Sequence, residues 1–181
     1  MDQKTLITTL ITIGVAVMGY LAKYINDIKI ANRKDKLERI NRQLKEVYGP
    51  LLSLTSSSKA SWTKFREFNR KDIPSYFDTI KPPSEEEKEI WRNWMQTVFV
   101  PINEKIYDVI LKNGDLIIED KFPDSFWKLC AHVETYRPVL KKWETKDYTE
   151  HVALLNYPDD IKDDVEKGYI KLKAEQNKLI K

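Results

Sequence analysis

One apolar run near the N-terminus limits what this chain can fold into more than any other feature. Residues 5–22, TLITTLITIGVAVMGYLA, include eighteen consecutive residues without a formal charge, between Lys4 and Lys23. As an α-helix rising about 1.5 Å per residue, the run would be about 27 Å long. That length nearly matches the roughly 30 Å hydrocarbon core of a bilayer, and the flanking lysines can reach the interface. The sequence therefore predicts a transmembrane anchor over residues 1–26 and a separate domain over residues 27–181.

Two other interpretations of the run stay open. A cleaved signal peptide needs a positively charged start and a cleavage site made of small residues. Here the first four residues, MDQK, carry no net charge, and Tyr20 occupies the −3 position of a cut after Ala22. A buried core helix is the second alternative, although the threonines and the two glycines of the run suit lipid better.

The charges that follow the run predict its orientation. Residues 23–46 carry eight Lys or Arg residues and four Asp or Glu residues, a net charge of +4. Positive charges close to a span stay on the cytoplasmic side. We therefore expect a single-pass protein of the bacterial inner membrane, with its N-terminus outside and its domain in the cytoplasm. The single cysteine, Cys130, agrees with a reducing compartment.

The same basic segment, residues 23–46, indicates a lipid partner. Anionic lipid of the inner leaflet attracts such a segment by up to about 1 kcal/mol per cation. Because the whole chain carries +3 and residues 1–22 are neutral, residues 47–181 carry −1. A nucleic-acid-binding domain needs a basic face of its own, so nucleic acid is not an expected partner.

Small residues within the run predict a helix-association face. Their spacing of three and four places them on one side of a helix, where close approach favours dimers in lipid. The alternative is that threonine, glycine and alanine are simply common in such helices. A homo-oligomer is therefore a hypothesis that rests on Thr8, Thr12, Ala16 and Gly19.

Residues 27–48 read as a basic juxtamembrane helix that continues out of the membrane, with a kink expected at Gly49 and Pro50. Apolar residues follow a heptad spacing along it and past the kink. They form either a short coiled-coil seam or one face of a helix that packs within its own domain. The seam residues are Leu37, Ile40, Leu44, Val47, Leu51 and Leu54.

The rest of the chain predicts helices and no strand pair, so the fold class is all-α, a multi-helix bundle. Residues 70–83 hold three prolines and read as a connector. Ser84 and Glu87 form a capping-box pattern, and Asn113-Gly114 is a stop signal. The expected helices cover residues 50–69, 84–112 with a kink at Pro101, 123–147 with an interruption near Pro138, and 158–181.

The sequence contains no recognisable set of catalytic residues, and no cofactor or metal is expected. Cys130, His132 and Glu134 are two residues apart, a spacing that spreads them around a helix. The five glycines are too scattered for a phosphate-binding loop. We therefore predict a protein that is not an enzyme.

Aromatic residues are the unusual feature of the domain. They could line a groove for a peptide or a small ligand, since such pockets are rich in aromatic side chains. The alternative is that they fill the core of a small bundle. The candidate groove residues are Trp62, Trp91, Trp94, Trp127 and Trp143.

At residues 37–54, LERINRQLKEVYGPLLSL, the chain resembles an uncharacterised group of bacterial single-span proteins. In that group an N-terminal anchor precedes a helix with a similar RQL-x-E-x-YGPL stretch, here at residues 41–51. The resemblance covers roughly the first third of the chain. It implies an inner-membrane protein with a cytoplasmic helical domain, and it implies no activity.

Three functions are compatible with these patterns. The first is a membrane-anchored, non-catalytic interaction or sensor module, with a protein partner or with self-association. The second is an effector that disturbs the membrane, as in bacterial defence against phage. The third is a helical domain that binds a small ligand in an aromatic pocket.

Overall fold

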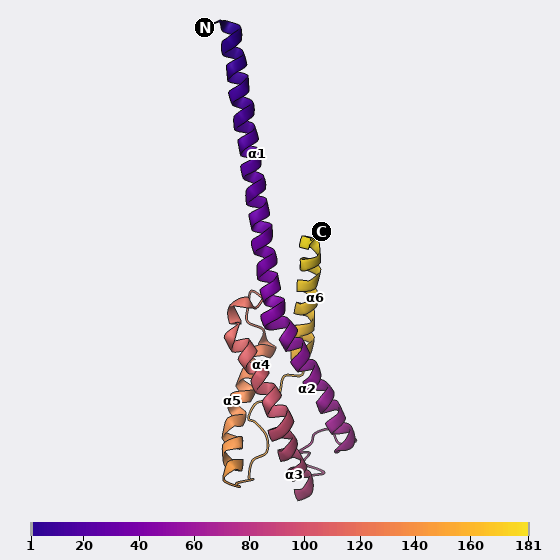
Figure 1. Ribbon diagram of the computed structural model, residues 1–181. Coiled ribbons are helices and arrows are strands. Elements are labelled where there is room, and N and C mark those ends of the chain that lie inside the picture. Colours follow the sequence, from indigo (N-terminus) through magenta and orange to yellow (C-terminus); the bar gives the residue numbers. More distant parts are fainter. Residues whose placement is uncertain (1, 181) are drawn as a thin grey trace.

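The computed structural model describes residues 2–180, except for the side chains of residues 5, 6 and 9. Within this part of the chain every regular element is helical, which confirms the predicted all-α fold. A bundle of helices lies at one end of a single long helix that projects away from it (Figure 1). The elements are α1 (Gln3–Arg42), the π-helical turn η1 (Gln43–Tyr48), α2 (Gly49–Phe68), α3 (Glu85–Trp94), the π-helical turn η2 (Met95–Phe99), α4 (Val100–Lys112), the 3-10 turn η3 (Gly114–Leu116), α5 (Asp124–Glu144) and α6 (Ile161–Ile180).

The projecting part of α1 contains the apolar run. Its large apolar side chains are exposed from Ile7 to Ile30, for example Met18 at 64% and Tyr20 at 70%, which contradicts the buried-core-helix interpretation. Across the described residues, no helix is both long enough and apolar enough to cross a membrane. The predicted anchor also includes Met1 and the side chains of residues 5, 6 and 9, which lie outside the described part.

At the position of the expected kink, the helix continues through a π-helical turn. The N–H of Gly49 donates to the carbonyl of Leu44, five residues earlier, instead of four. Pro50 has no N–H for the carbonyl of Glu46, and the Asn113 side chain donates to that carbonyl instead, at 3.3 Å. The wide turn therefore lets a proline follow without a break.

The same arrangement recurs at Pro101. There η2 precedes the proline, and the N–H of Val100 donates to the carbonyl of Met95. The predicted interruption near Pro138 is wrong, because α5 runs through that residue. Pro138 is exposed, so the carbonyl that loses its intrahelical donor faces water.

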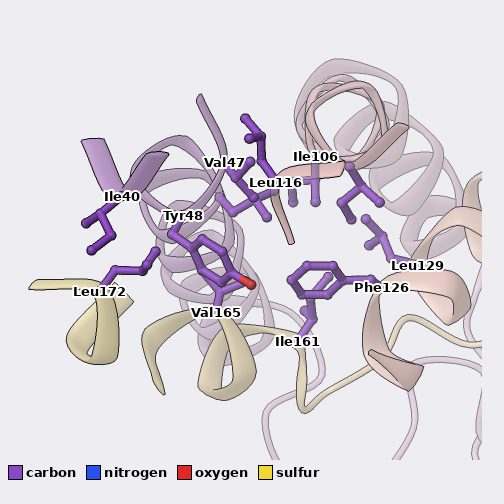
Figure 2. Packing of buried hydrophobic residues seen from close by; sticks show 12 residues of the cluster. Ile40, Val47, Tyr48, Ile106, Leu116, Phe126, Leu129, Ile161, Val165 and Leu172 are labelled. Atoms are coloured by element: carbon purple, nitrogen blue, oxygen red, sulfur yellow. The ribbon is translucent and has the colours of Figure 1, made fainter. Parts of the chain in front are cut away.

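The end of the bundle nearest α1 is held together by a cluster around Tyr48, which we call the Tyr48 cluster (Figure 2). Five of the six predicted seam residues belong to it or pack against it, with Val47 and Leu51 fully buried, and the sixth, Leu37, is half-buried. These side chains are therefore used inside the bundle, as the second interpretation of the seam predicts. The buried members are Ile40, Val47, Tyr48, Leu51, Ile106, Ile110, Leu116, Phe126, Leu129, Ile161, Val165 and Leu172.

The opposite end of the bundle is held together by a second cluster, here called the aromatic cluster. Phe65 lies at its centre and is 1% exposed. Five aromatic rings surround it at centroid distances between 5.2 and 6.0 Å. Such pairs add about 0.5–1.5 kcal/mol each beyond the burial of their area. The buried members are Phe65, Tyr76, Trp91, Met95, Phe99, Tyr136, Val139, Trp143 and Ala153.

Candidate functional site

A cavity of about 620 Å³ lies between the two clusters. Its walls come from α2, α3, η2, α4, α5 and the start of α6, from the connector between α2 and α3, and from the loop between α5 and α6. Pockets for small molecules in proteins have volumes of roughly 300–1,000 Å³ and mostly apolar walls. The cavity therefore has the size and the surroundings of a ligand site.

The cavity exists because α2 presents small polar residues where its seam would continue. After Leu51 and Leu54, the heptad spacing falls on Ser58 and Ser61 before it reaches Phe65. Ser58 is 5% exposed and lines the cavity together with Thr55, which is 1% exposed. The hydroxyl of Thr55 donates to the carbonyl of Leu51 at 2.7 Å and needs no further partner. Larger apolar residues here would fill the space with core.

Aromatic rings form the wall at the far end. Trp62 meets Trp91 nearly edge-on, with centroids 6.0 Å apart and an interplanar angle of 82°. It meets Phe99 at 5.6 Å and 73°. These rings fix one another and present flat apolar surface to the cavity.

The loop between α5 and α6 forms another wall, and its backbone is held by side chains of the helices. The carbonyl of His151 accepts hydrogen bonds from the Trp91 indole at 2.9 Å and from the Tyr136 hydroxyl at 2.8 Å. The carbonyl of Glu150 accepts one from the Trp143 indole at 2.7 Å. Two of the five tryptophans thus use their N–H groups to position this loop.

One further bond fixes the loop next to the cavity. Nδ1 of His132 lies 2.6 Å from the carbonyl of Leu155. A carbonyl can only accept, so the ring carries its proton on Nδ1. Burial lowers the pKa of His132 and outweighs the opposing effect of that carbonyl. The imidazole is therefore neutral at pH 7.

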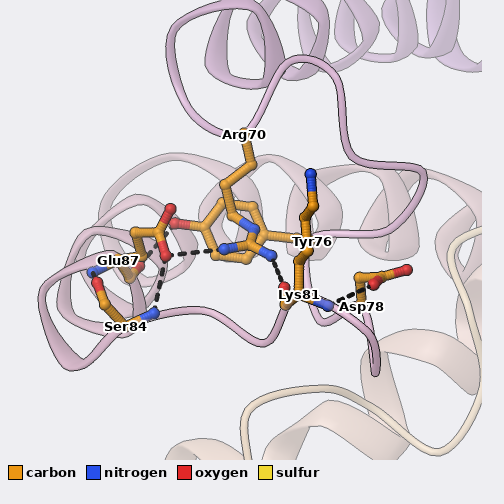
Figure 3. Close-up of polar contacts among 6 residues, drawn as sticks. All are labelled: Arg70, Tyr76, Asp78, Lys81, Ser84 and Glu87. Atoms are coloured by element: carbon orange, nitrogen blue, oxygen red, sulfur yellow. Dashed lines mark hydrogen bonds and ion pairs between the residues drawn. The ribbon is translucent and has the colours of Figure 1, made fainter.

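The connector is held against the cavity by Arg70 (Figure 3). Arg70 lies two residues after the end of α2. Its φ is 62°, a backbone conformation usual for glycine. Its guanidinium donates to the Glu87 carboxylate at 2.8 Å and also to the carbonyl of Lys81. The Tyr76 hydroxyl donates to the backbone carbonyl of Glu87 at 2.6 Å, and burial raises the pKa of Tyr76 to about 12. Glu87 and Ser84 form the predicted capping box.

Two polar groups on the cavity wall lack a partner among the described residues. Asn103 is 5% exposed, and its Oδ1 accepts no hydrogen bond. The Nη1 of Arg66 is buried and donates none, while its Nη2 donates to the carbonyl of Ile73. Burial, followed by the nearby charge of Arg70, lowers the pKa of Arg66. Leaving such buried polar groups unpaired is costly.

The structure separates the five tryptophans of the predicted groove. Trp62 and Trp91 line the cavity. Trp143 belongs to the aromatic cluster and Trp94 packs against it, and neither residue lines the cavity. Trp127 lies elsewhere, 46% exposed on α5, with its indole donating to Asp124 at 3.2 Å.

Sequence reasoning missed the polar lining, namely Thr55, Ser58, Arg66 and Asn103. A signal for Ser58 was present, because Ser58 and Ser61 continue the spacing of an apolar seam. The contribution of Asn103 had no such signal, because an asparagine on a helix is ordinary unless its neighbours are known.

The predicted association face of α1 makes no contact with the bundle. The hydroxyl of Thr12 donates to the carbonyl of Thr8 at 2.9 Å, within the helix. Ala16 and Gly19 are exposed, and nothing lies within 4 Å of a Cβ built on Gly19. Self-association through this face stays a prediction.

Comparisons with protein-family models, curated proteins and solved structures find no match to this chain. The resemblance of residues 37–54 to single-span bacterial proteins therefore stays a prediction.

Proposed function

We propose that this protein is a membrane-anchored, non-catalytic sensor module whose helical domain binds a small molecule. The observation that carries the proposal is the cavity of about 620 Å³ between the two clusters. Its walls combine aromatic surface with a few polar side chains, as specific ligand sites do. The small residues Thr55 and Ser58 keep it open at a place where larger side chains would add stability.

The membrane part of the proposal rests on α1. The guanidinium of Arg33 donates to the carbonyl of Leu179 at 2.7 Å, so α6 ends beside this residue. Arg33 lies eleven positions after Ala22, the last residue of the apolar run. At about 1.5 Å per residue, roughly 16 Å of helix lies between the bundle and the run. The full run includes residues 5, 6 and 9, and all eighteen of its residues are uncharged.

Charge supports an approach to anionic lipid from this side. The stretch of α1 between the run and the bundle is the first part of the basic segment, residues 23–46. The segment as a whole has a net charge of +4. The end of α6 points toward the same side of the molecule (Figure 1), and Lys178 lies on its last turn. We propose the bacterial inner membrane as the location, with the bundle in the cytoplasm.

Filling the cavity tests the ligand-binding part. Ser58→Leu places an apolar side chain into the open volume, so we expect the free energy of unfolding to stay equal or rise by about 1 kcal/mol. N-phenyl-1-naphthylamine, a neutral aromatic dye that fluoresces in apolar sites, should bind the wild-type chain and lose that binding in Ser58→Leu. Both proteins are measured at full length in the same mild detergent, so that dye bound to micelles or to α1 contributes equally.

The matched control is Ser57→Leu, because Ser57 is the exposed neighbour of Ser58 on the same helix. Its dye binding should equal that of the wild type. Equal dye signals from wild type, Ser57→Leu and Ser58→Leu would overturn the ligand-binding part of the proposal.

The anchor has a separate test. Changing Ile11 and Val15, both exposed on α1, to lysine adds two charges to the run. Each costs about 2.5–3.5 kcal/mol at the centre of a span, so the protein should leave the membrane fraction. The control changes the exposed Ile28 and Ile30, which lie beyond the run, to lysine, and this variant should stay in the membrane fraction. A double-lysine variant that stays membrane-bound after a carbonate wash would contradict the anchor.

A further inference from the structure

This inference rests on the proposed function and names the class of ligand. We infer that the cavity binds a flat aromatic anion, with its rings against Trp62 and Trp91 and its negative group beside Arg66 and Lys59. The charges on the cavity wall and the position of Arg66 support this ligand class.

The cavity wall has more positive than negative charge. Lys59, Arg66 and Lys162 line it, against the single carboxylate of Asp159. Lys162 forms an ion pair with Glu166, which does not line the cavity, at 2.7 Å. Within residues 2–180, Lys59 and Arg66 have no carboxylate within ion-pair distance. Two uncompensated cations therefore lie on the wall.

These two cations share one helix face with the aromatic surface. Lys59, Trp62 and Arg66 follow one another on α2 at spacings of three and four residues. Side chains at such spacings are neighbours on a helix. A ligand with its ring on Trp62 therefore has a cation within reach on either side.

Arg66 is placed unusually for an arginine. Its guanidinium lies 5.8 Å from the ring centre of Trp62 and 5.9 Å from that of Tyr76. Arg70, the neighbouring cation one helical turn on, already pairs with Glu87 at 2.8 Å. A half-buried guanidinium on the cavity wall without a carboxylate partner is stabilised by an anion more than by any neutral group. The inferred ligand therefore combines a flat ring with one anionic group.

Two dyes with the same body test the charge requirement. 8-Anilinonaphthalene-1-sulfonate is N-phenyl-1-naphthylamine with an added sulfonate, so the pair differs in one negative group. We expect the sulfonate to bind the full-length wild type at least about tenfold more tightly than the neutral dye, after subtraction of the Ser58→Leu signal. The double variant Lys59→Gln/Arg66→Gln should lose that advantage, so that its affinities for the two dyes differ by no more than about twofold.

The matched control is Lys64→Gln, because Lys64 is an exposed lysine of α2 that does not line the cavity. It should change neither affinity. Lys59→Gln alone is a second test that keeps the packing of Arg66 intact, and it should weaken only the sulfonate, by about threefold.

The outcomes separate the two proposals. If neither dye binds the wild type more than Ser58→Leu, the proposed function fails. If the neutral dye binds in the cavity but the sulfonate has no advantage, or keeps its advantage after both cations are removed, this inference is overturned while the proposed function stands. An equal loss of affinity for both dyes in Lys59→Gln would also overturn this inference.

Discussion

The ring of Tyr48, from the π-helical turn η1, lies directly against the backbone of α6 at Gly168, where α6 has no side chain. A Cβ atom built on Gly168 would lie 2.2 Å from Cε1 of Tyr48 and 2.6 Å from its Cδ1. The ring cannot easily move away. Its hydroxyl donates to Glu119 at 2.7 Å and accepts the N–H of Ile118 at 3.2 Å.

Gly168→Ala should therefore destabilise the bundle. Alanine gains about 1 kcal/mol of helix propensity over glycine, but overpacking of a fixed core ring costs more. We expect a net loss of about 2 kcal/mol in the free energy of unfolding, measured by urea titration. Gly114→Ala is the control, because nothing lies within 4 Å of a Cβ at Gly114. A neutral Gly168→Ala would mean that the two elements pack less closely.

The π-helical turn before Pro50 gives a second prediction. A Cβ on Gly49 would lie 2.6 Å from the carbonyl oxygen of Leu44, the acceptor of the Gly49 N–H. Because that oxygen belongs to the backbone and cannot turn away as a side chain could, Gly49→Ala should cost about 2 kcal/mol in the free energy of unfolding. Gly14→Ala, in the exposed part of α1 with nothing within 4 Å, should not destabilise. Thermal unfolding followed by circular dichroism measures both variants. Equal unfolding midpoints for Gly49→Ala and Gly14→Ala would contradict the close approach at Gly49.

Glu87 predicts how stability changes at acidic pH. The N–H of Ser84 and then the Arg70 guanidinium hold the pKa of Glu87 below its ordinary value, although burial opposes them. A carboxylate with a lowered pKa contributes stability above its unfolded pKa and loses it as the pH falls through the folded pKa. That part of the stability should be complete above about pH 4.5 and disappear below it.

Glu87→Gln should remove this pH dependence and cost about 2 kcal/mol at pH 7, because Arg70 loses its carboxylate partner. Glu86→Gln, an exposed glutamate of the same helix turn, is the matched control and should change stability by less than about 0.5 kcal/mol. Unfolding curves at pH 3.5, 4.5 and 7 separate the two variants. A parallel pH dependence for Glu87→Gln and the wild type would sink the prediction.

His132 predicts a second pH window, above that of Glu87. Its pKa is lowered by burial, so the unfolded chain binds a proton at a higher pH than the folded chain does. Stability is then complete above the unfolded pKa of about 6.5 and falls as the pH drops toward the folded pKa. We expect a lower unfolding midpoint at pH 5 than at pH 7.5.

His151 acts in the same direction, because burial, Arg92 and Lys88 lower its pKa. His132→Asn separates the two histidines, since an amide can still donate to Leu155 and does not titrate. The difference between pH 5 and pH 7.5 should shrink in this variant. An unchanged difference would assign the acid sensitivity to His151 or to other groups.

Local signals in the sequence predicted most of the helices. The capping box at Ser84 and Glu87 and the stop at Asn113-Gly114 act through atoms a few residues apart, so the sequence contains them in full. Pro138 shows the limit of this reasoning. A proline is tolerated inside a helix when the carbonyl it leaves free can reach water, and exposure is a property of the fold.

The candidate site was only partly predictable for the same reason. Spacing placed Trp62 and Trp91 on helix faces, but it could not separate them from Trp127, which the fold leaves at the surface. Whether an aromatic ring fills a core or borders a cavity depends on what stands opposite it. Here Thr55 and Ser58 line the same cavity, and they are too small to fill the space.

By itself, the sequence determined the all-helical class, the apolar N-terminal run and the basic segment after it, because periodicity and charge depend on neighbours along one helix. Only the tertiary structure decided that the seam is buried inside the bundle, that Tyr48 rests on Gly168, and that Arg66 and Asn103 line the cavity. Those features join residues more than thirty positions apart. Their energies come from packing and desolvation, which exist only once the helices have met.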